Sequence, residues 1–141
     1  MNWLTYAILA ATSFGFYNFF TKLSASKISP TIALMFIAGT SFIVASIATI
    51  VFKMTGQNLV LSKNAIILPI MAGLFTGMAE ILYLFMFSKN ATLSIGTPLV
   101  VGGTTVVAVI LGVLLIKEPL NITKLAGIVA TIVGLVLLSR G

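Results

Sequence analysis

The sequence contains no cysteine, no histidine and no aspartate, and only two glutamates. Without cysteine there is neither a disulfide framework nor a thiol nucleophile, and without histidine there is no imidazole for metal binding or acid–base chemistry. The two glutamates, Glu80 and Glu118, are expected at different depths of the fold, so they do not form a catalytic pair. We therefore expect no enzyme activity, no metal site and no cofactor.

Charged residues of either sign are also scarce. They make up 7% of the chain, whereas hydrophobic residues make up 60% and the mean hydropathy is +1.22. Soluble domains carry roughly a quarter charged residues, so this surface is expected to face the lipid bilayer. The net charge of +6 comes from lysines that stand singly between apolar segments. Because they form no continuous basic stripe, no nucleic-acid partner is expected.

Long apolar stretches fill the rest of the sequence. Each is long enough to cross a hydrocarbon core of about 30 Å as a helix that rises about 1.5 Å per residue. The sequence therefore predicts an all-α integral membrane protein with five transmembrane helices in a single domain over residues 1–141. The predicted helices cover residues 3–22, 31–52, 66–88, 94–116 and 122–139.

The basic residues are divided evenly between the two faces that this topology implies. Four lysines fall on the N-terminal face, and three lysines with Arg140 fall on the opposite face. An excess of Lys and Arg in short cytoplasmic loops normally fixes orientation, so an even division predicts insertion in both orientations. The alternatives are that a few of these positions outweigh the others, or that a helper protein fixes the orientation.

Several segments, taken in order, resemble a known family. Residues 91–99 (ATLSIGTPL), 117–120 (KEPL) and the Gly-rich stretch 125–138 look like the second half of an EamA-like repeat of the drug/metabolite transporter superfamily. Residues 13–22 (SFGFYNFFTK) are similar to the first helix of such a repeat, although Phe14 stands where tryptophan is common. The resemblance covers essentially the whole chain.

This resemblance implies two five-helix repeats of opposite orientation that enclose a solute path. The sequence shows a single repeat, half of an inverted-repeat transporter, so we expect a second copy to supply the other half in an antiparallel homodimer that works by alternating access. The implied function is transport of a small organic solute or metabolite across a prokaryotic-type inner (plasma) membrane. A non-transporting membrane partner subunit, or half of a heterodimeric transporter, remains the alternative.

Glu80 is the most informative single residue. It lies about three residues from the centre of the third stretch, roughly 4–5 Å from the bilayer midplane. An acid at that depth costs about 2.5–3.5 kcal/mol, which predicts a role in binding a proton or a cation. Thr76 and Tyr83 lie on the same helix face and extend a polar stripe. Lys22 is the only partner expected within the chain, and a purely structural pairing is the alternative.

The first stretch supplies the other predicted binding residues. Ser13, Tyr17 and Asn18, with Lys22 at the end of the stretch, complete the substrate- and proton-binding set around Glu80. Aromatic side chains follow both the first and the third stretches, and rings around a carboxylate suit an organic cation. The alternative is that these rings face lipid or the helix core.

Glycines mark two further features. Pro98 frees a backbone carbonyl one turn earlier, and Gly102 and Gly103 weaken the same helix, so a bend is expected there that is either a hinge or a static kink. Pairs of small residues four apart, such as Gly73 with Gly77, let helices approach closely in lipid. Such pairs suit packing either within one copy or between copies.

Overall fold

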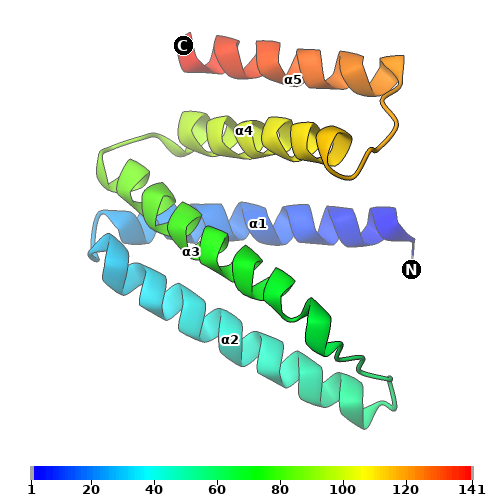
Figure 1. Ribbon diagram of the computed structural model, residues 1–141. Coiled ribbons are helices and arrows are strands. Elements are labelled where there is room, and N and C mark those ends of the chain that lie inside the picture. The colour runs from blue at the N-terminus through cyan, green and yellow to red at the C-terminus, as the bar shows by residue number, and fades with distance from the viewer. Residues whose placement is uncertain (1, 141) are drawn as a thin grey trace. The chain divides into compact units, whose positions relative to one another are not determined.

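Five α-helices and one short 3-10 helix form the part of the chain that the structure, a computed structural model, describes: residues 2–140 (Figure 1). Each of the five predicted helices is present, with ends displaced by three residues or fewer. The predicted domain begins and ends at residues outside the described range, and its being a single domain stays a prediction. The helices are α1 (Trp3–Ala25), α2 (Pro30–Met54), η1 (Lys63–Ala65), α3 (Ile67–Ser88), α4 (Leu93–Leu114) and α5 (Ile122–Arg140).

The helix ends follow from local chemistry. Pro30 lies in the first turn of α2, where its missing N–H is not needed. At the end of α3, Asn90 takes a left-handed conformation with φ of 68°, which asparagine tolerates. The Asn121 side chain accepts a hydrogen bond of 2.8 Å from the backbone N–H of Lys124 and so caps the start of α5. These breaks allow five long helices with short connections.

The helices have the length and composition of membrane spans, with one exception. Within the described residues, α2, α3 with η1, α4 and α5 are long and apolar enough to cross a bilayer. Helix α1 has 23 residues, about 34 Å by helix rise, but polar side chains interrupt its apolar sequence. A span with polar side chains such as Tyr17, Asn18 and Lys22 needs partners for them away from lipid. These side chains indicate that α1 contributes to a polar site.

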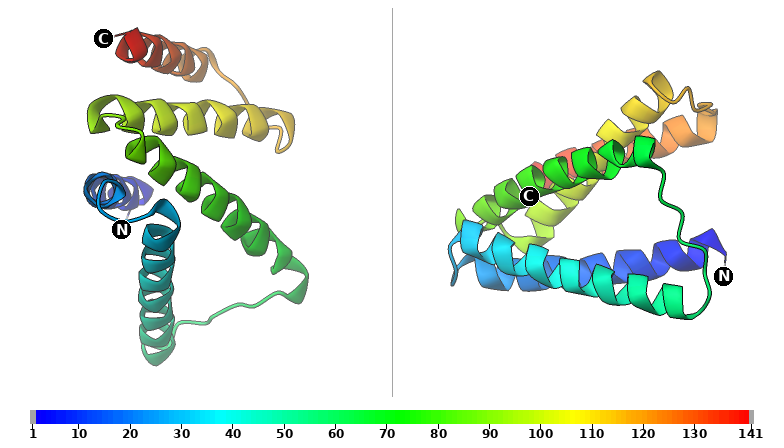
Figure 2. Two further views of the ribbon diagram at one scale, coloured as in Figure 1. Left: turned by 90° about the vertical axis from the view of Figure 1, so that its left-hand side faces the viewer. Right: turned by 60° about the horizontal axis from the view of Figure 1, so that its bottom comes forward.

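The chain divides into two compact units, and the first lies within Met1–Asn90. Its buried residues gather at one end, where α1 finishes, α2 begins and α3 finishes. Leu84 and Phe87 of α3 are 0% and 1% exposed, and Thr21, Ala25 and Ala33 are also buried. Toward the connection over residues 55–66, α2 and α3 diverge (Figure 2). The three helices are therefore packed together at one end, and their other halves expose large apolar side chains.

The second unit lies within Ala91–Gly141 and pairs α4 with α5. Gly102 is buried where the two helices meet, and a Cβ added there would lie 2.5 Å from Cδ1 of Leu135. After α4, Lys117 has a φ of 59° and the backbone N–H of Glu118 donates to the Gly112 carbonyl at 3.0 Å. This turn closes the helix and directs the chain through Pro119 into α5.

Candidate functional site

The centre of the candidate site is the Glu80 carboxylate on α3. By helix rise, Glu80 lies about 4 Å past the midpoint of α3, and its side chain is half-buried. The Tyr17 hydroxyl of α1 donates a hydrogen bond to Glu80 Oε2. The expectation that Lys22 is the only partner for this carboxylate within the chain is therefore wrong. A phenol supplies a hydrogen bond without neutralising the charge, so the site keeps one acidic group at mid-membrane.

Three more contacts continue from Glu80 along the same pair of helices. The Tyr83 hydroxyl donates to Asn18 Oδ1 at 3.0 Å, and the Tyr83 ring meets the Phe87 ring edge-on with centroids 4.7 Å apart. Lys22 Nζ lies 5.3 Å from the Phe87 ring centroid, within range of a cation–π interaction. Helices α1 and α3 run in the same direction (Figure 1), and these contacts form a polar and aromatic seam between them.

Ser13 and Thr76 take a different position from the other predicted site residues. Both are exposed, and each hydroxyl donates to a carbonyl of its own helix: Ser13 to Leu9 at 2.9 Å, and Thr76 to Ala72 at 2.8 Å. Since a hydroxyl has a single proton to donate, neither can donate to Glu80 in this state. The structure thus brings Tyr17, Asn18, Tyr83 and Glu80 together and leaves Ser13 and Thr76 outside this group.

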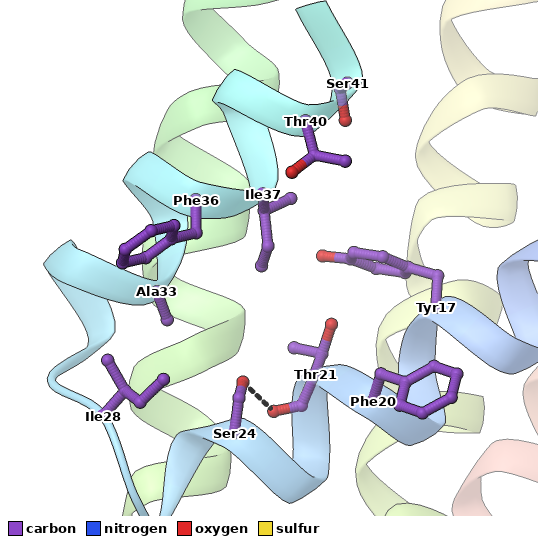
Figure 3. Close-up of a pocket in the computed structure, with 10 residues that line it drawn as sticks. All are labelled: Tyr17, Phe20, Thr21, Ser24, Ile28, Ala33, Phe36, Ile37, Thr40 and Ser41. Atoms are coloured by element: carbon purple, nitrogen blue, oxygen red, sulfur yellow. Dashed lines mark hydrogen bonds between the residues drawn. The ribbon is translucent and has the colours of Figure 1, made fainter. Parts of the chain in front are cut away.

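A cavity of about 410 Å³ opens beside this seam, between α1 and α2 (Figure 3). Tyr17 lines it, so the residue that binds Glu80 also forms part of the cavity wall. None of the ten lining side chains carries a charge. They are aromatic (Tyr17, Phe20, Phe36), hydroxyl-bearing (Thr21, Ser24, Thr40, Ser41) or aliphatic (Ile28, Ala33, Ile37).

A membrane-embedded carboxylate beside a solute-sized cavity is an arrangement expected of a transporter. The model of the EamA-like transporter family matches residues 1–140 of this sequence. The chain belongs to this family. Membership confirms the resemblance drawn from the motifs, and it makes the protein an integral membrane drug/metabolite transporter and not an enzyme. Neither a search of curated proteins nor a search of solved structures found a match.

The predicted hinge of this EamA-like transporter lies in the second unit. Helix α4 runs from Leu93 to Leu114 with Pro98 inside it, and Gly102 and Gly103 follow one turn later. Gly102 serves close packing, because Leu135 occupies the space that a side chain would need, whereas a Cβ at Gly103 would meet nothing within 4 Å. Movement at Pro98 stays a prediction.

The cavity of the EamA-like transporter was missed by sequence reasoning. Thr40 and Ser41 lie close to the middle of α2, which is otherwise strongly apolar, and that position was the signal that could have singled them out. Thr21 and Ser24 did not stand out in the sequence, because they lie near the end of α1 and polar residues are common at the membrane surface.

Proposed function

We propose that this EamA-like transporter carries a small organic cation in exchange for protons, and that it works as an antiparallel homodimer in an inner (plasma) membrane. The observation that carries the proposal is the mid-membrane Glu80 carboxylate, which accepts a hydrogen bond from Tyr17, a residue that also lines the cavity. An isolated acid at this depth is costly unless it binds a proton, a partner or a cation.

The proposed cycle follows from competition for one carboxylate. When Glu80 is ionised it attracts an organic ammonium group, and the rings of Tyr17 and Tyr83 in the same seam add cation–π attraction. When Glu80 binds a proton that attraction is lost, so solute leaves. Solute and proton therefore alternate at Glu80, and a proton gradient drives solute movement in the opposite direction.

A second copy is supported by surfaces that the first unit leaves uncovered. Gly73 and Gly77 lie four residues apart on α3, and a Cβ at either would meet nothing within 4 Å. Small residues with this spacing let helices of different copies approach closely in lipid. The even division of Lys and Arg between the two faces favours copies of opposite orientation. Two inverted copies supply the symmetry that alternating access uses.

The proposal predicts that Glu80→Gln abolishes coupled transport. The test uses purified protein in liposomes that contain a pH-sensitive dye. Organic amines, amino acids and sugars are screened for solute-induced proton movement. We expect amines to move protons through the wild type. In Glu80→Gln the loss of a charged hydrogen-bonding partner should weaken amine binding by roughly 10- to 100-fold and remove proton movement.

The matched control is Glu118→Gln, the same substitution at the only other acidic residue of the chain. Glu118 lies in the connection after α4, so this variant should transport at the wild-type rate. Well-folded Glu80→Gln protein that still moves protons with amines would reject the proposed role of Glu80. Binding of no solute of any class by the wild type would instead favour a non-transporting membrane subunit.

A further inference from the structure

Three hydroxyl groups of the α1–α2 cavity differ from those elsewhere in the protein, whereas a fourth, that of Ser24, donates to the Thr21 carbonyl at 2.9 Å. Beyond the first turn of a helix, serine and threonine side chains of this protein generally donate to a carbonyl three or four residues earlier, as Ser46 and Thr49 do on α2 at 2.8 Å each. The hydroxyls of Thr21, Thr40 and Ser41 have no hydrogen-bond partner among the described residues. All three line the cavity, and an unpaired hydroxyl in a membrane is costly.

These hydroxyls have a definite place in the cavity. Thr40 and Ser41 lie within about 3 Å of the midpoint of α2 by helix rise, near the depth of Tyr17. Figure 3 shows Thr40 and Ser41 on one side of the space and Tyr17 and Thr21 across it. Thr40 and Ser41 thus lie at mid-membrane, near the depth of the residue that binds Glu80, and Thr21 lies one turn further along α1.

We propose that this cavity binds the uncharged body of the transported amine, and that Thr21, Thr40 and Ser41 select solutes whose body carries hydroxyl or carbonyl oxygens. The inference rests on the proposed function and names its solute class. The volume of about 410 Å³ lies within the usual range for small-molecule sites, about 300–1,000 Å³. Phe20 and Phe36 supply ring faces for the apolar part of the solute. A lipid acyl chain would leave the three hydroxyls without partners.

Tyr17 connects this cavity to the carboxylate. The Tyr17 side chain forms part of the cavity wall, and its hydroxyl donates to Glu80. A solute whose oxygens bind Thr40 and Ser41 directs its ammonium group toward Glu80 and displaces the Tyr17 hydroxyl. Binding of the uncharged body of the amine in the cavity is then coupled to the loss of the hydrogen bond from Tyr17 to Glu80.

The test uses a single cysteine in a protein that has none of its own. Ile37→Cys places the thiol in the cavity wall and leaves all three hydroxyls intact, whereas Val44→Cys places it on the exposed surface of the same helix. In liposomes, a charged, water-soluble methanethiosulfonate should label Ile37→Cys and leave Val44→Cys, which faces lipid, unlabelled. The rate of labelling then reports occupancy of the cavity.

Two amines of the same skeleton serve as probes: phenylethylamine, and octopamine, which adds hydroxyl groups. Octopamine should slow the labelling of Ile37→Cys at concentrations about 2- to 10-fold lower than phenylethylamine for each hydrogen bond gained. Adding Thr40→Val and Ser41→Ala to Ile37→Cys should reduce this difference to what the remaining Thr21 hydroxyl supports. The control pair Ser46→Ala and Thr49→Val, whose hydroxyls bond within their own helix, should keep it.

Several outcomes would overturn the inference. If both amines slow the labelling of Ile37→Cys equally well, the hydroxyls do not select the solute. If neither amine slows it, the cavity does not bind amines. Labelling of Ile37→Cys only by a lipid-soluble maleimide would show that acyl chains fill the cavity, and a disulfide between two copies would show that a second copy fills it. Amine transport in liposomes with unchanged preference in the Thr40→Val, Ser41→Ala variant would also overturn it, and would leave the proposed function intact.

Discussion

At the scale of single residues, Tyr17 connects the two parts of the site, because its side chain lines the cavity and its hydroxyl donates to Glu80. We predict that Tyr17→Phe keeps the fold and slows proton-coupled amine transport by roughly 10- to 100-fold, because ionised Glu80, the form that attracts the amine, loses the hydrogen bond that stabilises it before solute binds. The measurement is the initial rate of proton movement in liposomes over a range of external pH.

The matched control is Tyr6→Phe, which removes a phenol hydroxyl from the same helix at an exposed position outside the site. This variant should transport at the wild-type rate. Unchanged coupling in Tyr17→Phe would mean that the Tyr17 hydroxyl is dispensable and that Glu80 works with other groups.

Sequence reasoning identified these residues but not their pairing. Glu80 could be singled out because an acid inside an apolar span is costly in lipid, and that cost depends on sequence position alone. The Tyr17 partner could not be singled out, because pairing depends on how α1 and α3 are rotated against each other. Both Tyr17 and Lys22 lie on α1, and only the packed helices put the Tyr17 hydroxyl at the carboxylate.

At the scale of helices, the contact between α4 and α5 depends on the absence of a side chain at Gly102. We predict that Gly102→Ala destabilises the protein by about 1–3 kcal/mol, because its Cβ would lie 2.5 Å from Cδ1 of Leu135 and one helix must shift. The measurement is the melting temperature of the purified protein.

Gly103→Ala is the neighbouring control, since its Cβ would meet nothing within 4 Å. It should leave the melting temperature unchanged or raise it slightly, because alanine favours a helix more than glycine does. Adding Leu135→Ala to Gly102→Ala should restore part of the lost stability. Equal effects of Gly102→Ala and Gly103→Ala would instead point to a loss of helix flexibility.

The helices themselves could be predicted closely from the sequence, because membrane thickness and the length of each apolar stretch leave little choice of where a helix begins and ends. The cavity could not, because it depends on where α1 and α2 separate, and apolar composition does not encode that separation. Helix α1 is less apolar than the other helices because it supplies polar side chains to the candidate site. Tyr17, Asn18 and Thr21 face other helices or the cavity.

At the scale of the whole molecule, the even division of basic residues predicts two orientations in the membrane. Reporters fused to the C-terminus should find it on both sides in comparable amounts. Moving one or two lysines from one face to the other should produce a single dominant orientation. Uniform orientation of the wild type would reject dual topology, and it would leave a heterodimeric transporter as the remaining arrangement.

Antiparallel pairing has its own geometric test on α3. Gly73 and Ile81 lie on one helix face with Gly77 between them, at similar distances of roughly 5–7 Å on either side of the helix midpoint. Copies with Gly73→Cys should therefore form disulfides with copies that carry Ile81→Cys. Disulfides that form only between two Gly73→Cys copies would indicate parallel packing.

The position of the buried residues in the first unit has a consequence for stability. Leu84, Phe87 and Thr21 hold α1, α2 and α3 together at one end, while their diverging halves lack such a core. If a second copy covers those halves, folding obeys mass action: each tenfold dilution of protein in lipid should remove about 1.4 kcal/mol of stability per dimer. The melting temperature should then fall as lipid is added, and one that does not change would indicate a self-sufficient monomer. In this sense each copy acts as the ligand that keeps the other folded.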